Sequence, residues 1–232
     1  MRKINFKVVW FSKGAERESD CFVVIDVFRT SSFIVTALHL GAKEIIPVKS
    51  VKQAFGIKRR KAVVLSGENK TKKIKGFDLG NSPHELREKG ELIKGKTLVH
   101  RSGAGTQVLS SISGNVVVGS VLNAKAVADH ISGSKFKRVC FVCAGLDNRH
   151  FAIEDLYGVK TIVEQMKMKM DCDPENDFAI LSKCVTEEMV KKSEGAKRLR
   201  SCGYKNDIDL CLQKNAFEIV PTMKNGRIRM GE

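Results

Sequence analysis

The stretch CFVVIDVFRTSS, residues 21–32, sets five apolar residues directly before an aspartate and then an arginine with three hydroxyl side chains. An apolar run of this length between polar residues predicts a strand that is buried on both faces of a covered sheet. In open α/β sheets ligands bind at the carboxyl ends of such strands, so this edge is the expected binding site. The hydroxyl residues precede a helical pattern at 32–40, and the free N–H groups of a helix N-terminus suit a phosphate.

Two charged side chains in this stretch indicate its chemistry. Arg29 offers a planar set of donors that can bind a phosphate or another anion through two hydrogen bonds. Asp26 would repel a phosphate, so we expect it to hold a metal ion or to act as a nucleophile. The structural alternative is that Thr30 or Ser31 is an ordinary helix cap and Arg29 a surface residue. The segment alone does not choose between the two interpretations.

Strand-like and helical patterns alternate over most of the 232 residues. Alternating elements with short connections are typical of βα units, which place helices on both faces of a largely parallel sheet. The clearest break is DCDPEN at 171–176, either a linker or a turn into a helical C-terminal subdomain from about residue 175. We expect one domain over residues 1–232. The predicted strands are 7–11, 22–25, 44–47, 62–65, 97–99, 115–118 and 139–142, and the predicted helices include 32–40, 51–57, 106–111, 124–130 and 154–170.

The chain is strongly basic, because 41 Lys and Arg against 26 Asp and Glu give a net charge of +15. Such a charge attracts either small anionic substrates or nucleic acid. Aromatic residues make up only 6% of the chain, and none alternate with the basic runs as a platform for stacked bases would require. We therefore interpret the basic runs as a solvated surface, and we do not expect nucleic acid as a partner.

Composition also indicates the compartment. No apolar run approaches the ~20 residues of a membrane span, and the first residues lack the apolar segment of a signal peptide. The seven cysteines are an odd number without the spacing of a small disulfide framework, which is typical of a reducing environment. We expect a cytoplasmic protein without a membrane partner. Its oligomeric state stays open, a homo-oligomer included.

Polar and glycine-rich segments follow several predicted strands, so their side chains are expected to meet at one edge of the sheet. RSGAGT at 101–106 is typical of a phosphate-binding loop, because its glycines expose backbone N–H groups before a helix. Asp147, Glu154 and Asp155 follow the strand at 139–142, and hard carboxylate oxygens suit Mg²⁺. The alternative for Glu154 and Asp155 is a favourable charge in the first turn of a helix.

Four strings occur in this order along the chain: VIDVFRTSS at 24–32, GFDLGNSP at 76–83, CAGLD at 143–147 and FAIEDL at 151–156. Together they resemble the 2-phosphosulfolactate phosphatase family, the ComB-like proteins of coenzyme M biosynthesis, and the resemblance covers nearly the whole chain. It implies a Mg²⁺-dependent phosphatase with a three-layer α/β/α fold around a largely parallel or mixed sheet. The family reaction converts 2-phospho-3-sulfolactate to 3-sulfolactate and phosphate.

From the residues and this resemblance we predict Mg²⁺-assisted hydrolysis of a phosphate monoester. Three alternatives stay open: an aspartyl-phosphate intermediate at Asp26, another small phosphorylated hydroxy acid as substrate, or an inactive basic protein that binds anions or nucleic acid. The predicted catalytic residues are Asp26, Glu68 and Asp78, and the predicted metal ligands are Asp26, Asp147, Glu154 and Asp155. The predicted substrate-binding residues are Arg29, Thr30, Asn81, Ser102, Gly103, Gly105, Thr106, Asn123 and Arg149.

Overall fold

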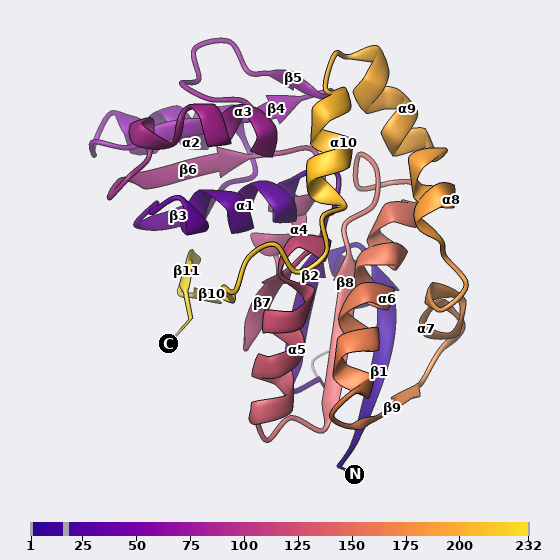
Figure 1. Ribbon diagram of the computed structural model, residues 1–232. Coiled ribbons are helices and arrows are strands. Elements are labelled where there is room, and N and C mark those ends of the chain that lie inside the picture. The colour runs from indigo at the N-terminus through magenta and orange to yellow at the C-terminus, as the bar shows by residue number, and fades with distance from the viewer. Residues whose placement is uncertain (1, 16–18, 232) are drawn as a thin grey trace.

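The computed structural model describes residues 2–15 and 19–231 of the chain. Its strands are β1 (Lys3–Trp10), β2 (Cys21–Ile25), β3 (Glu44–Pro47), β4 (Val64–Asn69), β5 (Lys72–Lys73), β6 (Thr97–Arg101), β7 (Val116–Gly119), β8 (Arg138–Cys143), β9 (Asp171–Pro174), β10 (Pro221–Lys224) and β11 (Arg227–Met230). The described strands form one sheet in the order β5-β4-β6-β3-β11-β10-β7-β2-β8-β1-β9 (Figure 1).

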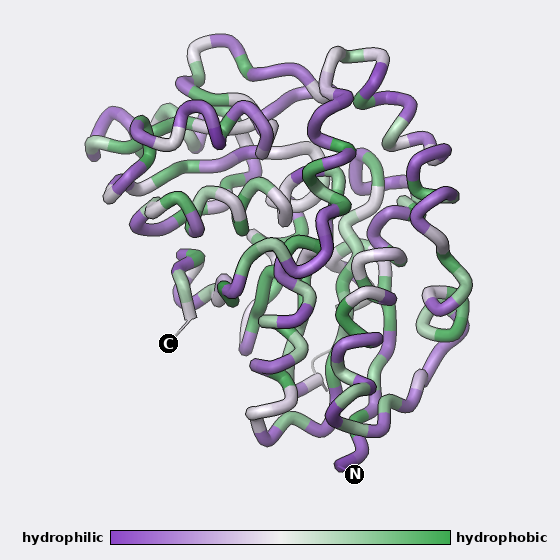
Figure 2. Tube along the Cα trace, in the orientation of Figure 1, coloured by the Kyte–Doolittle hydropathy of each residue, from purple (hydrophilic) through white to green (hydrophobic). Residues whose placement is uncertain are grey.

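Strand β2 is fully buried and pairs in parallel with β7 on one side and with β8 on the other. Its side chains alternate between two hydrophobic cores: Cys21, Val23 and Ile25 belong to one, and Phe22 and Val24 to the other. Hydrophobic residues accordingly run along the central strands (Figure 2). The prediction of a strand covered on both faces is confirmed.

Helices cover both faces of the sheet (Figure 1). They are α1 (Thr30–His39), α2 (Val51–Lys58), α3 (Pro83–Glu88), α4 (Gly105–Leu109), α5 (Ala124–Gly133), α6 (Ile153–Lys167), α7 (Asp177–Ser182), α8 (Glu187–Lys191), α9 (Glu194–Ser201) and α10 (Lys205–Cys211), with 3₁₀ turns η1 (Ser12–Gly14), η2 (Gly90–Leu92) and η3 (Val121–Asn123). Residues of α5 and α6 fill the core that contains Val23, and residues of α1 and α4 fill the core that contains Val24. The fold is a three-layer α/β/α fold around a mixed sheet, as predicted. No helix of the described ranges is long and apolar enough to cross a membrane.

The segment 171–176 is mostly a strand, not only the linker or turn that its composition indicates. Strand β9 pairs in parallel with β1 as the outermost strand on that side of the sheet. Four short helices follow: α7 packs on β1 and α6, whereas α10 packs on α3, which lies on the other face. The C-terminal helices therefore pass over the carboxyl ends of the central strands (Figure 1). A separate subdomain from about residue 175 stays a prediction.

The last two strands, β10 and β11, form a hairpin that inserts between β7 and β3, antiparallel to both. The sequence patterns place no strand there. Glu44 of β3 is buried and pairs with two arginines of β11: Arg227, and Arg229, whose Nη2 lies 2.6 Å from Glu44 Oε2. These ion pairs hold the hairpin against β3, with which β11 has one paired ladder position, Ile228 with Ile45.

We expect Glu44→Gln to lower the free energy of unfolding by about 1–2 kcal/mol, because two partly exposed arginines lose their charge partner. Urea denaturation at neutral pH measures the loss. Asp129→Asn is the matched control, since Asp129 also pairs with two cations, Lys125 and Lys169, but at the surface. Its expected loss is below about 0.5 kcal/mol. Equal losses in both variants would contradict an anchoring role for Glu44.

His100 of β6 belongs to the core. Its ring stacks on Phe33 with the centroids 4.5 Å apart, and its Nδ1 lies 2.9 Å from Ser66 Oγ. Burial lowers the pKa of His100 to about 3, and the positive charges of Arg29 and Arg101 contribute to the decrease. The imidazole is therefore neutral in the folded protein at any physiological pH.

His100 should make the fold sensitive to acid. Its pKa is near 6.5 in the unfolded chain but about 3 in the fold, so its stabilising contribution is complete above about pH 6.5 and is lost as the pH falls towards 3. In this window it adds up to about 1.4 kcal/mol per pH unit to the slope of the unfolding free energy. We expect His100→Phe, which keeps a ring against Phe33, to remove that slope in urea denaturation series between pH 4 and 7. Parallel curves for the variant and the wild type would contradict the prediction.

Candidate active site

A cleft opens where β2, β4, β6 and β8 end. This is the edge of the sheet at which the sequence predicts ligand binding. Helix α9, from the C-terminal part of the chain, forms another wall. The lining residues are Asp26, Phe28, Arg29, Thr30, Glu68, Thr71, Asn81, Ser102, Gly103, Ala104, Gly145, Leu146, Asp147, Gly195, Arg198 and Leu199.

Asp26 lies between the beginnings of two helices. Its Oδ1 accepts a hydrogen bond from the Thr30 backbone N–H at 3.1 Å, and its Oδ2 accepts one from the Gly105 N–H at 2.9 Å. A Cβ atom at position 105 would lie 2.5 Å from Asp26 Oδ2, so this approach requires glycine. Burial raises the pKa of Asp26, hydrogen bonds from Thr30 and Gly105 oppose the rise, and the charge of Glu68 adds to it. The carboxylate is thus fixed in position at the end of β2.

The hydroxyl side chains of the predicted phosphate loop form one connected network. Thr30 Oγ1 donates to Ser102 Oγ at 2.9 Å, and Ser102 Oγ accepts the Thr106 backbone N–H at 3.0 Å. Thr106 Oγ1 accepts from the Ser102 N–H and donates to the Ser102 carbonyl. Ser102 and Gly103 line the cleft, whereas Thr106 is buried and closes the turn from within.

Glu68 joins two loops at the rim of the cleft. Its Oε1 accepts the Gly103 N–H at 2.6 Å, and its Oε2 accepts the Thr71 N–H at 2.7 Å. The first bond reaches the loop after β6, and the second reaches the turn between β4 and β5. Glu68 is buried as a residue, yet it lines the cleft. Glu68 is therefore placed both to shape the cleft and to exchange a proton with a ligand in it.

Arg29 is a buried residue that lines the cleft. Its Nη1 lies 2.7 Å from Asp207 Oδ2, its Nη2 donates to the Thr71 carbonyl at 2.8 Å, and its guanidinium carbon lies 4.1 Å from the centre of the Tyr204 ring. Asp207 Oδ1 also accepts from Ser82 Oγ at 2.6 Å. This arrangement fixes the orientation of Arg29, so the surface alternative for this residue does not hold.

Two more acids begin helix α6. Asp155 accepts backbone N–H groups on both oxygens, from Val27 and from Gly145, each at 2.9 Å. It therefore ties the loop after β2 to the loop after β8. Burial raises the pKa of Asp155 well above its ordinary value, and the charges of Asp26 and Glu154 add to the rise. The three carboxylates are close enough to affect one another.

Glu154 is almost fully buried, and neither carboxylate oxygen has a hydrogen-bond partner among the described residues. Burial raises the pKa of Glu154 to about 7, the nearby Ser193 hydroxyl opposes the rise, and the charge of Asp26 adds to it. Gly195 of α9 lines the cleft and lies directly against Glu154: a Cβ atom there would lie 2.0 Å from Glu154 Oε1. Burying a carboxylate without a partner is energetically costly unless the group is protonated or binds a cation.

Comparison of the sequence with known proteins places the chain in a family. Residues 11–226 match the family described as 2-phosphosulpholactate phosphatase. The chain belongs to this family. A probable 2-phosphosulfolactate phosphatase of Thermotoga petrophila is 40% identical over 209 residues, which is 88% of this chain and 89% of that protein. Proteins of the same name from Caldanaerobacter subterraneus and Clostridium tetani are 36% and 35% identical, over 90% and 89% of this chain and 90% and 91% of their own lengths.

Membership of the 2-phosphosulpholactate phosphatase family confirms the prediction of a phosphoric monoester hydrolase. Among the described residues, no group of three or more His, Cys, Asp and Glu side chains could by itself hold a metal ion. Mg²⁺, however, often takes only one or two carboxylates and completes its shell with water and substrate phosphate. The two unpaired oxygens of Glu154, with Asp26 nearby, fit such a sparse donor set.

Some residues singled out in the sequence lie away from the cleft of this family member. Asp78 pairs with Lys58 Nζ at 2.8 Å and accepts the Leu65 N–H, so it braces its loop outside the cleft. Asn123 Oδ1 accepts the Ser120 N–H, and its Nδ2 donates to the carbonyls of Val118 and Ile219. These hydrogen bonds anchor the chain before the C-terminal hairpin.

The other predicted residues lie in or beside the cleft. Asn81 lines it with a buried Oδ1 that has no partner among the described residues. Asp147 is at the rim, 2.7 Å from Arg198 Nη1. Arg149 is exposed in a neighbouring recess.

Sequence analysis missed several residues of the site. Thr71, Gly195, Arg198 and Leu199 line the cleft, and Asp207 and Tyr204 hold Arg29. No local pattern marks the Asp207 carboxylate as the partner of Arg29, since 178 positions separate the two residues.

Proposed function

We propose that this protein is a Mg²⁺-dependent phosphatase that hydrolyses 2-phospho-3-sulfolactate to 3-sulfolactate and phosphate. The observation that carries the proposal is the single cleft in which Asp26, fixed by two backbone N–H groups, adjoins buried Arg29 and the Ser102–Gly103 turn. The names of the relatives supply the substrate, and the basic surface of the chain suits a substrate with several negative charges.

Arg29 is the residue we assign to the phosphate. Its ion pair with Asp207 and its bond to the Thr71 carbonyl fix the guanidinium plane at the wall of the cleft, where it can face an anion. A pre-oriented donor set needs no rearrangement as negative charge develops on the phosphate oxygens. Thr30 and Ser102 add hydroxyl groups next to it.

Glu154 and Asp26 would hold Mg²⁺, which when bound neutralises phosphate charge and helps to activate water. We assign Asp155 a positioning role, because its two oxygens join the loops that carry Asp26 and Asp147 and, unlike Asp26, it does not line the cleft. In the reaction, water oxygen bonds to phosphorus and the bond from phosphorus to the C2 oxygen breaks. We assign Glu68 to proton exchange, because its carboxylate lines the cleft.

The test is phosphate release from 2-phospho-3-sulfolactate, with Mg²⁺ and with EDTA. We expect turnover that EDTA abolishes and added Mg²⁺ restores. Release without a metal requirement would refute the role of Mg²⁺, and turnover of only other phosphorylated hydroxy acids would refute the substrate. Acid-quenched mass spectrometry separates the two routes to phosphate, because a covalent intermediate would add a phosphoryl mass at Asp26.

A further inference from the structure

Exposed apolar side chains gather around helix α7 on one side of the molecule. Phe151, Ile180 and Leu181 are 61%, 52% and 51% exposed. The ring of Phe151 packs on Phe178 of α7 with the centroids 5.3 Å apart, and both rings lie against Trp10. Apolar side chains that form one connected exposed patch are typical of a surface that contacts another macromolecule.

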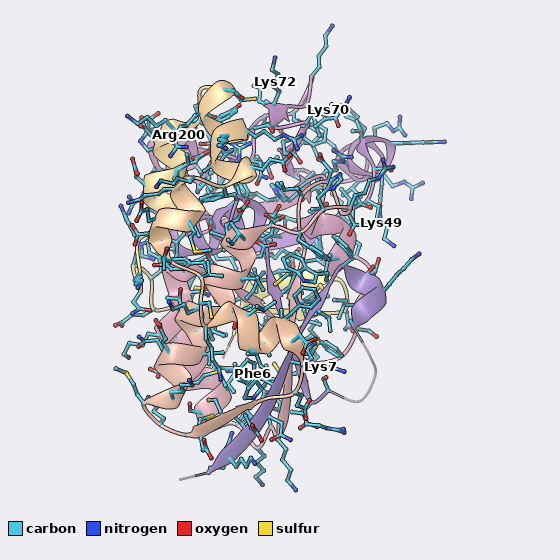
Figure 3. All side chains as sticks on the ribbon, turned by 90° about the vertical axis from the view of Figure 1, so that its right-hand side faces the viewer. Phe6, Lys7, Lys49, Lys70, Lys72 and Arg200 are labelled. Carbon is cyan, nitrogen blue, oxygen red and sulfur yellow. The ribbon has the colours of Figure 1, made fainter. Side chains whose placement is uncertain are left out.

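Helix α7 is held firmly, so this surface is preformed. Asn176 caps the helix by accepting the Ala179 N–H at 3.1 Å, and it exchanges two hydrogen bonds with the Val8 backbone, at 3.1 and 2.8 Å. The helix lies beside β1 and β9, at the right of Figure 1. Figure 3 looks onto this side of the molecule, where Phe6 and Lys7 of β1 are labelled. A partner therefore meets ordered side chains, which lose little freedom on binding.

The local charge of this surface differs from that of the rest of the chain. Residues 171–188 contain six acids and one lysine, whereas the whole chain has a net charge of +15. Three of the acids are neutralised by lysines, in the pairs Lys3–Asp173, Lys191–Glu187 and Lys192–Glu188. Two copies of a strongly basic chain repel each other over most of their surfaces, so they meet with least repulsion here.

The two ends of α7 carry opposite charges. Asp177 is the first residue of the helix and Lys183 is its C-cap; both are exposed, and neither forms an ion pair with another described residue. Ile180 and Leu181 lie between them. Two such helices packed side by side in opposite directions bring each acid to a lysine and place the apolar residues together. This is the self-complementarity that a two-fold axis requires.

We propose that two copies of this chain associate through α7 about a two-fold axis. Ile180 and Leu181 of both copies form the centre of the contact, Phe151 extends it, and Asp177 of each copy pairs with Lys183 of the other. The charge pattern favours a second copy over a different partner, because α7 complements itself. The inference is independent of the proposed function, since none of these residues lines the cleft.

Sedimentation velocity over a series of protein concentrations tests the association. We expect the wild type to reach twice the chain mass of 25.7 kDa and to form no larger species. Leu181→Glu should raise the Kd of the dimer by about a hundredfold, because it brings two like charges together near the axis and removes apolar contact. Leu92→Glu is the matched control, since Leu92 is 48% exposed but lies in the 3₁₀ turn η2, outside this surface. It should dimerise as the wild type does.

Charge reversal tests the antiparallel pairing separately. Asp177→Lys and Lys183→Asp should each raise the Kd by about tenfold, and the variant with both changes should return to within about threefold of the wild type. Circular dichroism spectra establish that each variant is folded. A wild type that is monomeric at every concentration, species larger than a dimer, a dimer that Leu181→Glu leaves intact, or no recovery in the double variant would each overturn the proposal.

Discussion

Asp26→Asn should lower kcat for phosphate release by about a thousandfold at saturating Mg²⁺. The amide cannot accept a proton or neutralise a cation. In the wild type the carboxylate accepts hydrogen bonds from the backbone N–H groups of Thr30 and Gly105. In the variant the NH₂ group of the amide faces one of these two N–H groups. Two donors then face each other in a buried site, so the reactive end of β2 loses both its charge and its geometry. Phosphate release under single-turnover conditions measures the chemical step.

Asp78→Asn is the matched control for this loss. The sequence also marks Asp78 as a catalytic candidate, but its carboxylate lies outside the cleft on Lys58 and the Leu65 N–H. We expect its activity within about threefold of the wild type. A comparable collapse of kcat in both variants would show that the cleft is not the reaction centre. Circular dichroism spectra establish that each variant is folded.

Gly195→Ala should reduce kcat/KM by about a hundredfold and weaken the response to Mg²⁺. The added methyl carbon would lie 2.0 Å from Glu154 Oε1 and 2.9 Å from its Cδ, so either the carboxylate or helix α9 must move. Overpacking of this kind also lowers the free energy of unfolding, by about 1–3 kcal/mol. The measurements are a Mg²⁺ titration of phosphate release and the increase in melting temperature that Mg²⁺ produces in each protein.

Gly56→Ala in helix α2 makes the same chemical change where no atom lies within 4 Å of the new carbon. It should leave kcat/KM unchanged and raise stability by about 0.4–1 kcal/mol. If Gly195→Ala keeps the Mg²⁺-dependent increase in melting temperature of the wild type, Glu154 is not a site for the metal.

The parts of the fold that the sequence predicts are those whose pattern is local. Strand β2 and Asp26 follow from one continuous apolar run and its end. The hairpin of residues 221–230 does not, because each of its strands has only four residues, and β11 is stabilised by Glu44, about 180 positions earlier in the chain. Pairings over such distances depend on the assembled sheet and leave no periodic signal in the segment itself.

The same limit applies to the site. Asp26, Arg29, Glu68 and the Ser102 turn come from strand ends, and the topology of α/β sheets brings strand ends together. Asp78 shares that local signal, yet its pairing with Lys58 cannot be deduced from its glycine-flanked string. Gly195 has no local signal, although its position matters. Glycine is required there only because Glu154 lies against it in the fold, so in the sequence it looks like an ordinary residue of a basic helix.

The C-terminal hairpin has a consequence for the order in which the protein matures. It supplies the backbone pairing between two groups of strands, β5-β4-β6-β3 and β7-β2-β8-β1-β9. The cleft takes Asp26 from one group and Glu68 and Ser102 from the other. Because the ribosome makes the hairpin after all the other described strands of the sheet, each group can form first, but the two are joined only once the hairpin has been made. Chains that stop before residue 221 should therefore carry most of the catalytic side chains without assembling them into an enzyme.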